Sequence, residues 1–422
     1  MMSKEKRRVP KLRFPGFTED WEQRKLGDLI FLNGRIGFRG YTEADIVSKD
    51  EGGVLTFSPT NIVDNQITIK CKNTYITRLK YDESPEIKIY NGDILFVKTG
   101  STLGKSALVK DIFEDATLNP QVVVMRPNNL DSEFLSVMIL TDNIASQVRK
   151  SRIGGAVPTL TESNIKAFDT LIPKNDEEAQ KIGKIFGNLD HVITLHQRKL
   201  NNIKLKKKAL LQKLFPKNGE RYPELRFPGF TDAWEQRKLS DISTKVTTKN
   251  VDVHYTETLT NSAEQGIISQ VDFFDKEISN KDNINGYYIV DNNDFIYNPR
   301  ISTLAPVGPI NRNKLNRTGI MSPLYTIFRA SNVDLGFLEW YFQSSHWHRY
   351  MKLNGDSGAR ADRIAIKDST FFEMPIKTPV NIKEQVLIGE TLEKFNQYIT
   401  LHQRKLEHLQ LQKKALLQQM FV

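Results

Sequence analysis

LRFPGFTEDWEQRKL occupies residues 12–26, and LRFPGFTDAWEQRKL occupies residues 225–239. A second pair of matching stretches follows later in the chain. ITLHQRKLNNIKLKKKALLQKLF at 193–215 and ITLHQRKLEHLQLQKKALLQQMF at 399–421 are identical at 16 of 23 positions. The chain is therefore a tandem duplication, in which each copy consists of a head, a middle and a tail.

The two middles have diverged far more than the heads and tails. GDILFVKTGST at 92–102 aligns with NDFIYNPRIST at 293–303, and we take Pro173 and Pro375 as the matching ends of the two middles. Two long copies are too few for a solenoid, which stacks several short repeats. The duplication instead predicts two similar domains related by an approximate twofold axis. Such an arrangement suits duplex DNA, which has a twofold axis of its own at every base pair.

Each tail carries apolar residues at alternating steps of four and three, the 3.5-residue period of paired helices. We predict that the two tails pair with each other as antiparallel helices of roughly 55–60 Å. The pairing positions are Ile182, Phe186, Leu189, Ile193, Leu200, Ile203, Leu210 and Leu214 in the first tail, and Ile388, Leu392, Phe395, Ile399, Leu406, Leu409, Leu416 and Met420 in the second. His196, Lys207, His402 and Lys413 occupy the remaining positions. These polar residues either fix the register of the helices or extend their long side chains to water.

The middles combine short β-branched or aromatic runs with amphipathic segments. The runs predict strands at 93–98, 122–127, 294–298 and 325–330, and the amphipathic segments predict helices at 133–151 and 338–352. We therefore expect an α/β (α+β) fold with two similar mixed-sheet domains, related by a pseudo-twofold axis and separated by the two long antiparallel helices. The expected boundaries are 1–174 and 215–378 for the domains and 175–214 and 379–422 for the helices, with a linker at 215–224.

Composition points to a nucleic-acid partner and a cytoplasmic location. The 422 residues include 60 Lys and Arg against 50 Asp and Glu, and this net charge of +10 attracts polyanions. Cys71 is the single cysteine, so no internal disulfide can form. No apolar run approaches the ~20 residues of a membrane span, and the charged start MMSKEKRRVP lacks the apolar region of a secretory signal. We expect no contact with a membrane.

Motifs for catalysis are weak. KTGSTLGKS at 98–106 resembles a phosphate-binding loop, but only three residues separate Gly100 from Gly104, where that loop has four. His346 and His348 lie two residues apart, so on a helix they face different sides and make a poor metal site. Neither a methyltransferase motif nor a Ser/His/Asp arrangement is apparent. We predict no catalytic residue, no metal and no cofactor in this chain.

The duplicated head LRFPGFT..WEQRKL, the tails ending ALLQ.(L/M)F and the two divergent middles together resemble the specificity subunit of type I restriction-modification systems. The resemblance covers the whole chain. It implies that each middle is a target recognition domain reading one half of a split DNA sequence, and that the tails set the gap between the halves. It also implies two methyltransferase and two restriction subunits as partners, which would carry S-adenosylmethionine, ATP and Mg²⁺.

Base edges are read mainly by Arg, Lys, Asn, Gln, Ser and Thr side chains, and such residues occur in loops that align between the copies. A first loop supplies Lys98, Thr99, Ser101, Thr102 and Lys105 in one copy, and Arg300, Ser302 and Thr303 in the other. A second supplies Arg149, Lys150, Arg152 and Thr159, and Arg349, Arg360 and Arg363. We predict that these residues bind DNA. For each of them, a solvated surface position is the alternative.

Two other functions remain open at this point. The chain could be a free-standing nuclease or methyltransferase, in which case it alone would cut or methylate DNA. It could also be a stand-alone DNA-binding protein or a scaffold that uses the coiled coil without a restriction partner. A scaffold would select no motif from random duplexes.

Overall fold

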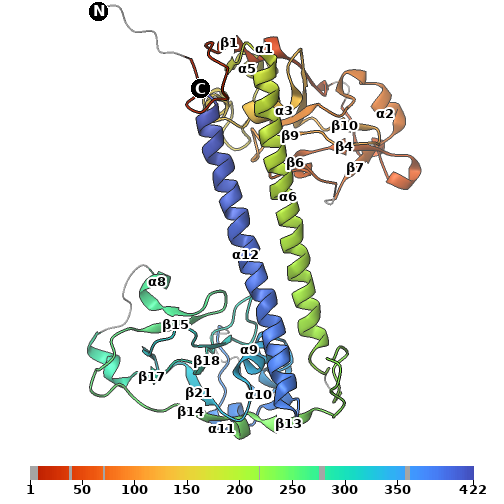
Figure 1. Cartoon of the computed structure of the whole chain (residues 1–422). Coiled ribbons are helices and arrows are strands. Elements are labelled where there is room, and N and C mark those ends of the chain that lie inside the picture. The colour runs from red at the N-terminus through yellow and green to blue at the C-terminus, as the bar shows by residue number, and fades with distance from the viewer. Residues whose placement is uncertain (1–7, 38–39, 70–71, 218, 275–280, 357–361) are drawn as a thin grey trace, which may run out of the picture. The chain divides into compact units, whose positions relative to one another are not determined.

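A computed structural model describes residues 8–37, 40–69, 72–217, 219–274, 281–356 and 362–422. The chain divides into two compact units (Figure 1). Unit 1 comprises Met1–Gln197 and Arg404–Val422, and unit 2 comprises Arg198–Gln403. Each unit therefore contains the head, the middle and the start of the tail from one copy, and the end of the tail from the other.

The main sheet of unit 1 is buried on both faces. Its order is β2 (Ile30–Gly34), β11 (Val122–Pro127), β8 (Ile94–Val97) and β9 (Ser106–Leu108), with antiparallel neighbours. Ile94 and Phe96 pack into one apolar cluster, and Leu95 and Val97 pack into another. Because alternate residues of a strand point to opposite faces, two cores explain why these strands are continuously apolar.

Further elements complete unit 1. A second sheet has the order β10 (Ala116–Leu118), β4 (Val54–Phe57), β7 (Thr74–Ile76) and β3 (Ile46–Val47). Two-stranded pairings join β1 (Glu22–Lys25) to β12 (Asp169–Ile172), and β5 (Ile62–Val63) to β6 (Gln66–Ile67). The shorter helices are α1 (Leu26–Leu29), α2 (Arg78–Asp82), α3 (Ser132–Met138), α4 (Asp142–Ser151) and α5 (Glu162–Lys166).

Unit 2 repeats the main sheet with different residues. The order is β14 (Ser243–Lys245), β21 (Thr326–Ala330), β18 (Phe295–Tyr297) and β19 (Ile310–Arg312). Three pairings join β13 (Glu235–Lys238) to β22 (Pro375–Thr378), β15 (Leu259–Ser262) to β16 (Gly266–Ser269), and β17 (Tyr288–Val290) to β20 (Gly319–Met321). The helices are α7 (Leu239–Ile242), α8 (Gln270–Phe274), α9 (Leu335–Gln343), α10 (His348–Asn354) and α11 (Asp368–Phe372). The four predicted strands are confirmed as β8, β11, β18 and β21.

The prediction of one helix in each of the segments 133–151 and 338–352 is wrong. In unit 1 the segment breaks into α3 and α4 at Thr141, whose hydroxyl donates to the carbonyl of Met138 at 2.8 Å. In unit 2 it breaks into α9 and α10 after Ser344, whose hydroxyl donates to the carbonyl of Tyr341. Local hydroxyl–backbone bonds of this kind compete with the helical ladder, and both residues have extended backbone angles.

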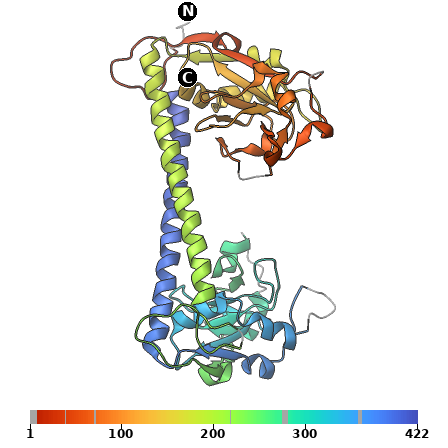
Figure 2. The same cartoon turned by 90° about the vertical axis from the view of Figure 1, so that its right-hand side faces the viewer.

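The two tails form long helices, α6 (Asp176–Lys213) and α12 (Ile382–Met420), drawn in yellow-green and blue in Figures 1 and 2. In unit 1 the start of α6 lies against the end of α12. Phe186 packs on Phe421 with ring centroids 6.2 Å apart, and Asp190 accepts a hydrogen bond from the ammonium of Lys413 at 2.6 Å. The residue numbers rise along one helix as they fall along the other, so the paired segments run antiparallel.

Unit 2 contains the corresponding contact between α6 and α12. Lys207 donates to the side-chain oxygen of Asn396 at 2.9 Å, and its ammonium lies 4.4 Å from the ring centroid of Trp340. Lys207 and Lys413 therefore contact the neighbouring helix and do not simply extend into water. Burial lowers the pKa of Lys207. A polar contact at one such position restricts the register of a helix pair.

Every predicted pairing residue is buried or half-buried, although several pack on a domain core. Ile182 and Phe186 belong to the core of unit 1, and Ile388 and Leu392 belong to that of unit 2.

Two details of the sequence analysis are wrong. Phe215 was assigned to a linker, but it is 1% exposed, and its ring centroid lies 6.1 Å from that of Trp234. The reason is that the apolar end of the first tail completes the core of unit 2. Pro173 follows β12, whereas Pro375 opens β22. The residue that corresponds to Pro173 is therefore Pro379, which follows β22.

The repeated heads anchor the first turns of the long helices. Arg13 forms two hydrogen bonds with Glu178 of α6, at 2.7 and 2.8 Å, and the indole of Trp21 donates to the same carboxylate at 3.4 Å. In unit 2, Arg226 and Trp234 make the same bonds to Glu384. These contacts explain why the arginine of LRFPGFT and the tryptophan of WEQRKL occur in both copies.

Candidate nucleic-acid interface

The two predicted DNA-binding loops of unit 1 lie side by side at one end of the main sheet. The first loop connects β8 to β9, and the second follows α4. Gly100 donates its backbone N–H to the carbonyl of Pro158 at 3.0 Å, and Leu160 donates to the carbonyl of Lys98 at 2.8 Å. Thr99 and Thr159 form the bridge between these bonds. Backbone contacts therefore hold residues from the two loops in one surface.

Unit 2 joins the corresponding loops in the same way. Arg300 and Arg363 form the bridge, Ile301 donates to the carbonyl of Asp362 at 2.9 Å, and Ile364 donates to that of Pro299 at 2.9 Å. The two units thus share a backbone arrangement while presenting different side chains.

Each predicted DNA-binding residue that the structure describes is exposed or half-buried. The exposed ones are Ser101, Lys105, Arg149, Lys150, Arg152, Arg300, Ser302, Thr303 and Arg349, and the half-buried ones are Lys98, Thr99, Thr102, Thr159 and Arg363. Arg360 lies outside the described residues. The assignment of Arg149, Lys150 and Arg349 to loops is wrong, because the first two end α4 and the third lies in α10.

Carboxylates lie beside the basic residues in both surfaces. The ammonium of Lys98 is 3.4 Å from a carboxylate oxygen of Glu162, the first residue of α5. In unit 2, Arg300 and Arg363 each approach Asp362, at 4.0 Å. Ion pairs at such distances on a partly exposed surface are weak, so these basic groups are available to other anions.

Sequence reasoning missed a turn beside the first loop. The register of β8 and β11 pairs Val97 with Val122, which places the preceding turn at the same end of the sheet. Lys98 donates its N–H to the carbonyl of Gln121 at 2.8 Å. Asn119 donates to the side chain of Gln121 at 3.3 Å, and both amides can read adenine. The loop at 98–105 and this turn flank the predicted strands at 93–98 and 122–127, so pairing these two strands could have revealed the position of Asn119 and Gln121.

Unit 2 has an apolar surface where unit 1 has these amides. The register of Tyr297 with Thr326 places Leu324 at the same end of the sheet as the loop that contains Leu304. These leucines are 62% and 70% exposed. Apolar side chains contact the methyl group of thymine, so the two units offer different chemistry to a base edge.

The segment 98–106 connects two strands, β8 and β9, whereas a phosphate-binding loop leads into a helix. Nucleotide binding there has no structural support. Among the described residues, no group of three or more His, Cys, Asp or Glu side chains is arranged to hold a metal ion.

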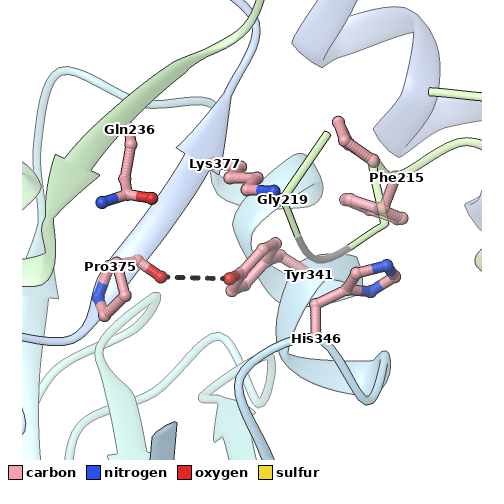
Figure 3. A pocket seen from close by; sticks show the side chains of 8 residues that line it. Phe215, Gly219, Gln236, Tyr341, His346, Pro375 and Lys377 are labelled. Carbon is pink, nitrogen blue, oxygen red and sulfur yellow. Dashed lines mark hydrogen bonds between the residues drawn. The ribbon is translucent and has the colours of Figure 1, made fainter. Parts of the chain in front are cut away.

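A pocket of about 140 Å³ in unit 2 lies beside the end of the first tail (Figure 3). Phe215, Tyr341 and His346 line it, and the hydroxyl of Tyr341 donates to the carbonyl of Pro375 at 3.2 Å. Lys377 donates to the carbonyls of Lys217 and Glu220. Burial lowers the pKa of His346, and the neighbouring Trp347 is buried in the core. The two hydrogen bonds from Lys377 hold the segment that joins the two copies against unit 2.

Known proteins resemble this chain over all or part of its length. Residues 18–205 match the model of the type I restriction modification DNA specificity domain. The chain is 25% identical over 206 residues to a putative type I restriction enzyme MjaX specificity subunit of Methanocaldococcus jannaschii. The aligned region covers 47% of this chain and 46% of that protein. The aligned part of this chain thus spans about half the length of that relative.

Two longer similarities cover nearly the whole chain. The type I restriction enzyme MjaVIII specificity subunit of the same organism is 23% identical over 431 residues, covering 94% of this chain and 91% of the relative. The crystal structure of a type I restriction-modification S subunit from M. genitalium covers 98% of this chain and 99% of its own, with a TM-score of 0.59 and 12% identity. At that identity the structural similarity establishes the fold. In the part of the chain that the structure describes, no helix has the length and apolar character to cross a membrane.

Proposed function

Because the chain belongs to the family of type I restriction-modification specificity subunits, we propose that it selects the DNA sequence for such a complex. Each unit reads one half of a split double-stranded target. The chain performs no chemistry itself. Methylation and ATP-dependent cleavage belong to its partners, which carry S-adenosylmethionine, ATP and Mg²⁺.

The repeated loop bridge is the observation that carries this proposal. In each unit, equivalent backbone contacts join the two corresponding loops. The bridge is Thr99–Thr159 in unit 1 and Arg300–Arg363 in unit 2. The side chains on this common backbone differ, with amides and Lys98 in unit 1 and arginines and exposed leucines in unit 2. A common scaffold with different base-reading side chains is what two different half-sites require.

A repeated helical surface supports two identical partners. Leu205, Ala209 and Gln212 on α6 are exposed, and Leu411, Ala415 and Gln418 on α12 have the same spacing, identity and exposure. The steps of four and three place each trio on one helix face. We assign one methyltransferase subunit to each trio, giving two methyltransferase subunits and, with them, two restriction subunits. We also propose that the complex acts in the cytoplasm.

Selection from a pool of random duplexes tests this function. We expect a split motif with a fixed gap between its halves. Arg300→Ala with Arg363→Ala should relax only one half, by about 1–3 kcal/mol for each lost base contact, and Lys98→Ala with Lys105→Ala should affect only the other. Recovery of no enriched motif would support a coiled-coil scaffold instead. Methylation or cleavage by the purified chain alone would support the free-standing enzyme.

A further inference from the structure

Glu162 places a carboxylate in the surface that unit 1 presents to DNA. It follows the loop that ends at Thr159, and its side chain is 37% exposed. Its carboxylate oxygen lies 3.4 Å from the ammonium of Lys98, whose side chain is 19% exposed. A carboxylate near phosphates weakens DNA binding by repulsion, so its presence here needs a compensating role.

The last residue of β2 limits how this pair can move. A Cβ added at Gly34 would lie 2.8 Å from the carboxylate oxygen of Glu162 and 3.1 Å from the ammonium of Lys98. The pair therefore rests directly on the backbone of β2. Because the strand blocks inward movement, either side chain can leave the pair only by turning outward to the exposed surface.

We propose that Glu162 is a specificity-determining residue that restrains Lys98 and accepts a hydrogen bond from the exocyclic amino group of a base in the correct half-site. This inference rests on the proposed function. When the base edge offers an amino donor, as cytosine does to Glu in the major groove, the carboxylate gains a partner and Lys98 turns to a phosphate. When the base edge offers none, the carboxylate repels the DNA and holds Lys98 back.

Unit 2 lacks this arrangement. Asp368 begins α11 as Glu162 begins α5, but it pairs with Lys245 of β14. Pro299 occupies the position that corresponds to Lys98, so no ammonium is present there. The restraint therefore acts on the half-site of unit 1 alone.

Glu162→Gln keeps the size of the side chain and removes its charge. We expect the full-length variant to bind a non-specific duplex about 2- to 5-fold more tightly, the range for one partly exposed charge interaction. The slope of log affinity against log salt should steepen by up to about 0.9, since Lys98 gains one phosphate contact. Selection from random duplexes should relax at one position of one half-site, by about fivefold or more.

Glu114→Gln is the matched control, because Glu114 forms an exposed ion pair with Lys49 at 2.9 Å and its loss changes the net charge equally. It should change neither the salt slope nor the motif. With Lys98→Ala already present, Glu162→Gln should gain less on non-specific DNA and should leave the salt slope unchanged, because no Lys98 ammonium remains to contact a phosphate. Melting temperatures verify that each variant is folded.

Two results would overturn the inference. One is equal behaviour of Glu162→Gln and Glu114→Gln. The other is tighter binding of Glu162→Gln to every sequence with an unchanged motif. That result would show that Glu162 acts only through its negative charge and reads no base. The wild-type chain separates this inference from the proposed function. A wild type that selects no motif contradicts the function, whereas a wild type and a Glu162→Gln variant that select the same split motif contradict only the role of Glu162.

Discussion

At the scale of single residues, Glu178 and Glu384 connect each head to its long helix. Both carboxylates have 1% exposed side chains and accept bonds from an arginine and a tryptophan. Hydrogen bonds to Glu178 and Glu384 raise the pKa of Arg13 and Arg226, respectively. Both arginines remain charged throughout the usual pH range, so each buried carboxylate retains its counter-charge.

Glu178→Ala should cost about 3–5 kcal/mol, because it leaves the guanidinium of Arg13 in a nearly buried site without its partner. Hydrogen exchange followed by mass spectrometry should show faster exchange in the head at 12–26 and unchanged exchange at 225–239. Glu384→Ala should give the reverse pattern. Glu177→Ala is the control, since Glu177 is 63% exposed in an ion pair with Lys181 and its loss should cost under about 0.5 kcal/mol. Equal exchange in both heads of either buried-site variant would disprove the separate anchoring.

At the scale of elements, a glycine in each long helix permits close packing on a shorter one. Asp131 caps α3 by accepting the N–H of Phe134 at 2.8 Å, and Asp334 caps α9 in the same way. A Cβ on Gly183 would lie 2.6 Å from the carboxylate oxygen of Asp131, and one on Gly389 would lie 2.9 Å from the backbone nitrogen of Phe337. Each glycine therefore lies directly over a helix cap.

Gly183→Ala should destabilise unit 1 by about 1–3 kcal/mol through overpacking, although alanine is intrinsically the better helix former by ~1 kcal/mol. Denaturant titration of the purified protein, monitored by hydrogen exchange in α3, measures the change. Gly187→Ala is the matched control one turn along α6, where the new Cβ meets only the flexible carboxylate of Glu133, at 3.0 Å. It should be neutral or stabilising. A stabilised Gly183→Ala variant would show that the cap can shift freely.

Hydrophobic periodicity correctly predicted the strands and helices whose pattern lies within their own sequence. The apolar runs of β8 and β11 and the heptads of α6 and α12 are local patterns, so the sequence suffices to locate them. The breaks at Thr141 and Ser344 depend on one hydroxyl bond each, which periodicity does not record. The pairing of Lys98 with Glu162 and the position of Gln121 depend on which segments the sheet brings together. The site could therefore be predicted as two loops, but not as a set of contacts.

At the scale of the whole molecule, neither copy is complete without the other. The core of unit 1 contains Met420 and Phe421 from the second tail, and the core of unit 2 contains Leu214 and Phe215 from the first. Each tail thus closes the domain of the other copy. This exchange favours retention of matching heads and tails, since every head must fit both tails, while the loops proposed to read DNA at the sheet ends can diverge.

The repeated trios on α6 and α12 predict how many partners the chain binds. Leu205 and Leu411 are each 66% exposed, and exposed leucines at equivalent places of both copies are natural anchors for one type of partner. Leu205→Glu should remove one methyltransferase subunit from the complex, Leu411→Glu should remove one, and the double variant should remove both, since a charge in an apolar contact costs about 2 kcal/mol or more. Native mass spectrometry of the reconstituted complex counts the subunits. Leu79→Glu on α2 is the control, because Leu79 is 76% exposed but has no repeated counterpart, and it should leave two subunits bound. Loss of both subunits from either single variant would mean that the partners bind cooperatively through a single surface, and retention of both by the double variant would exclude these helix faces.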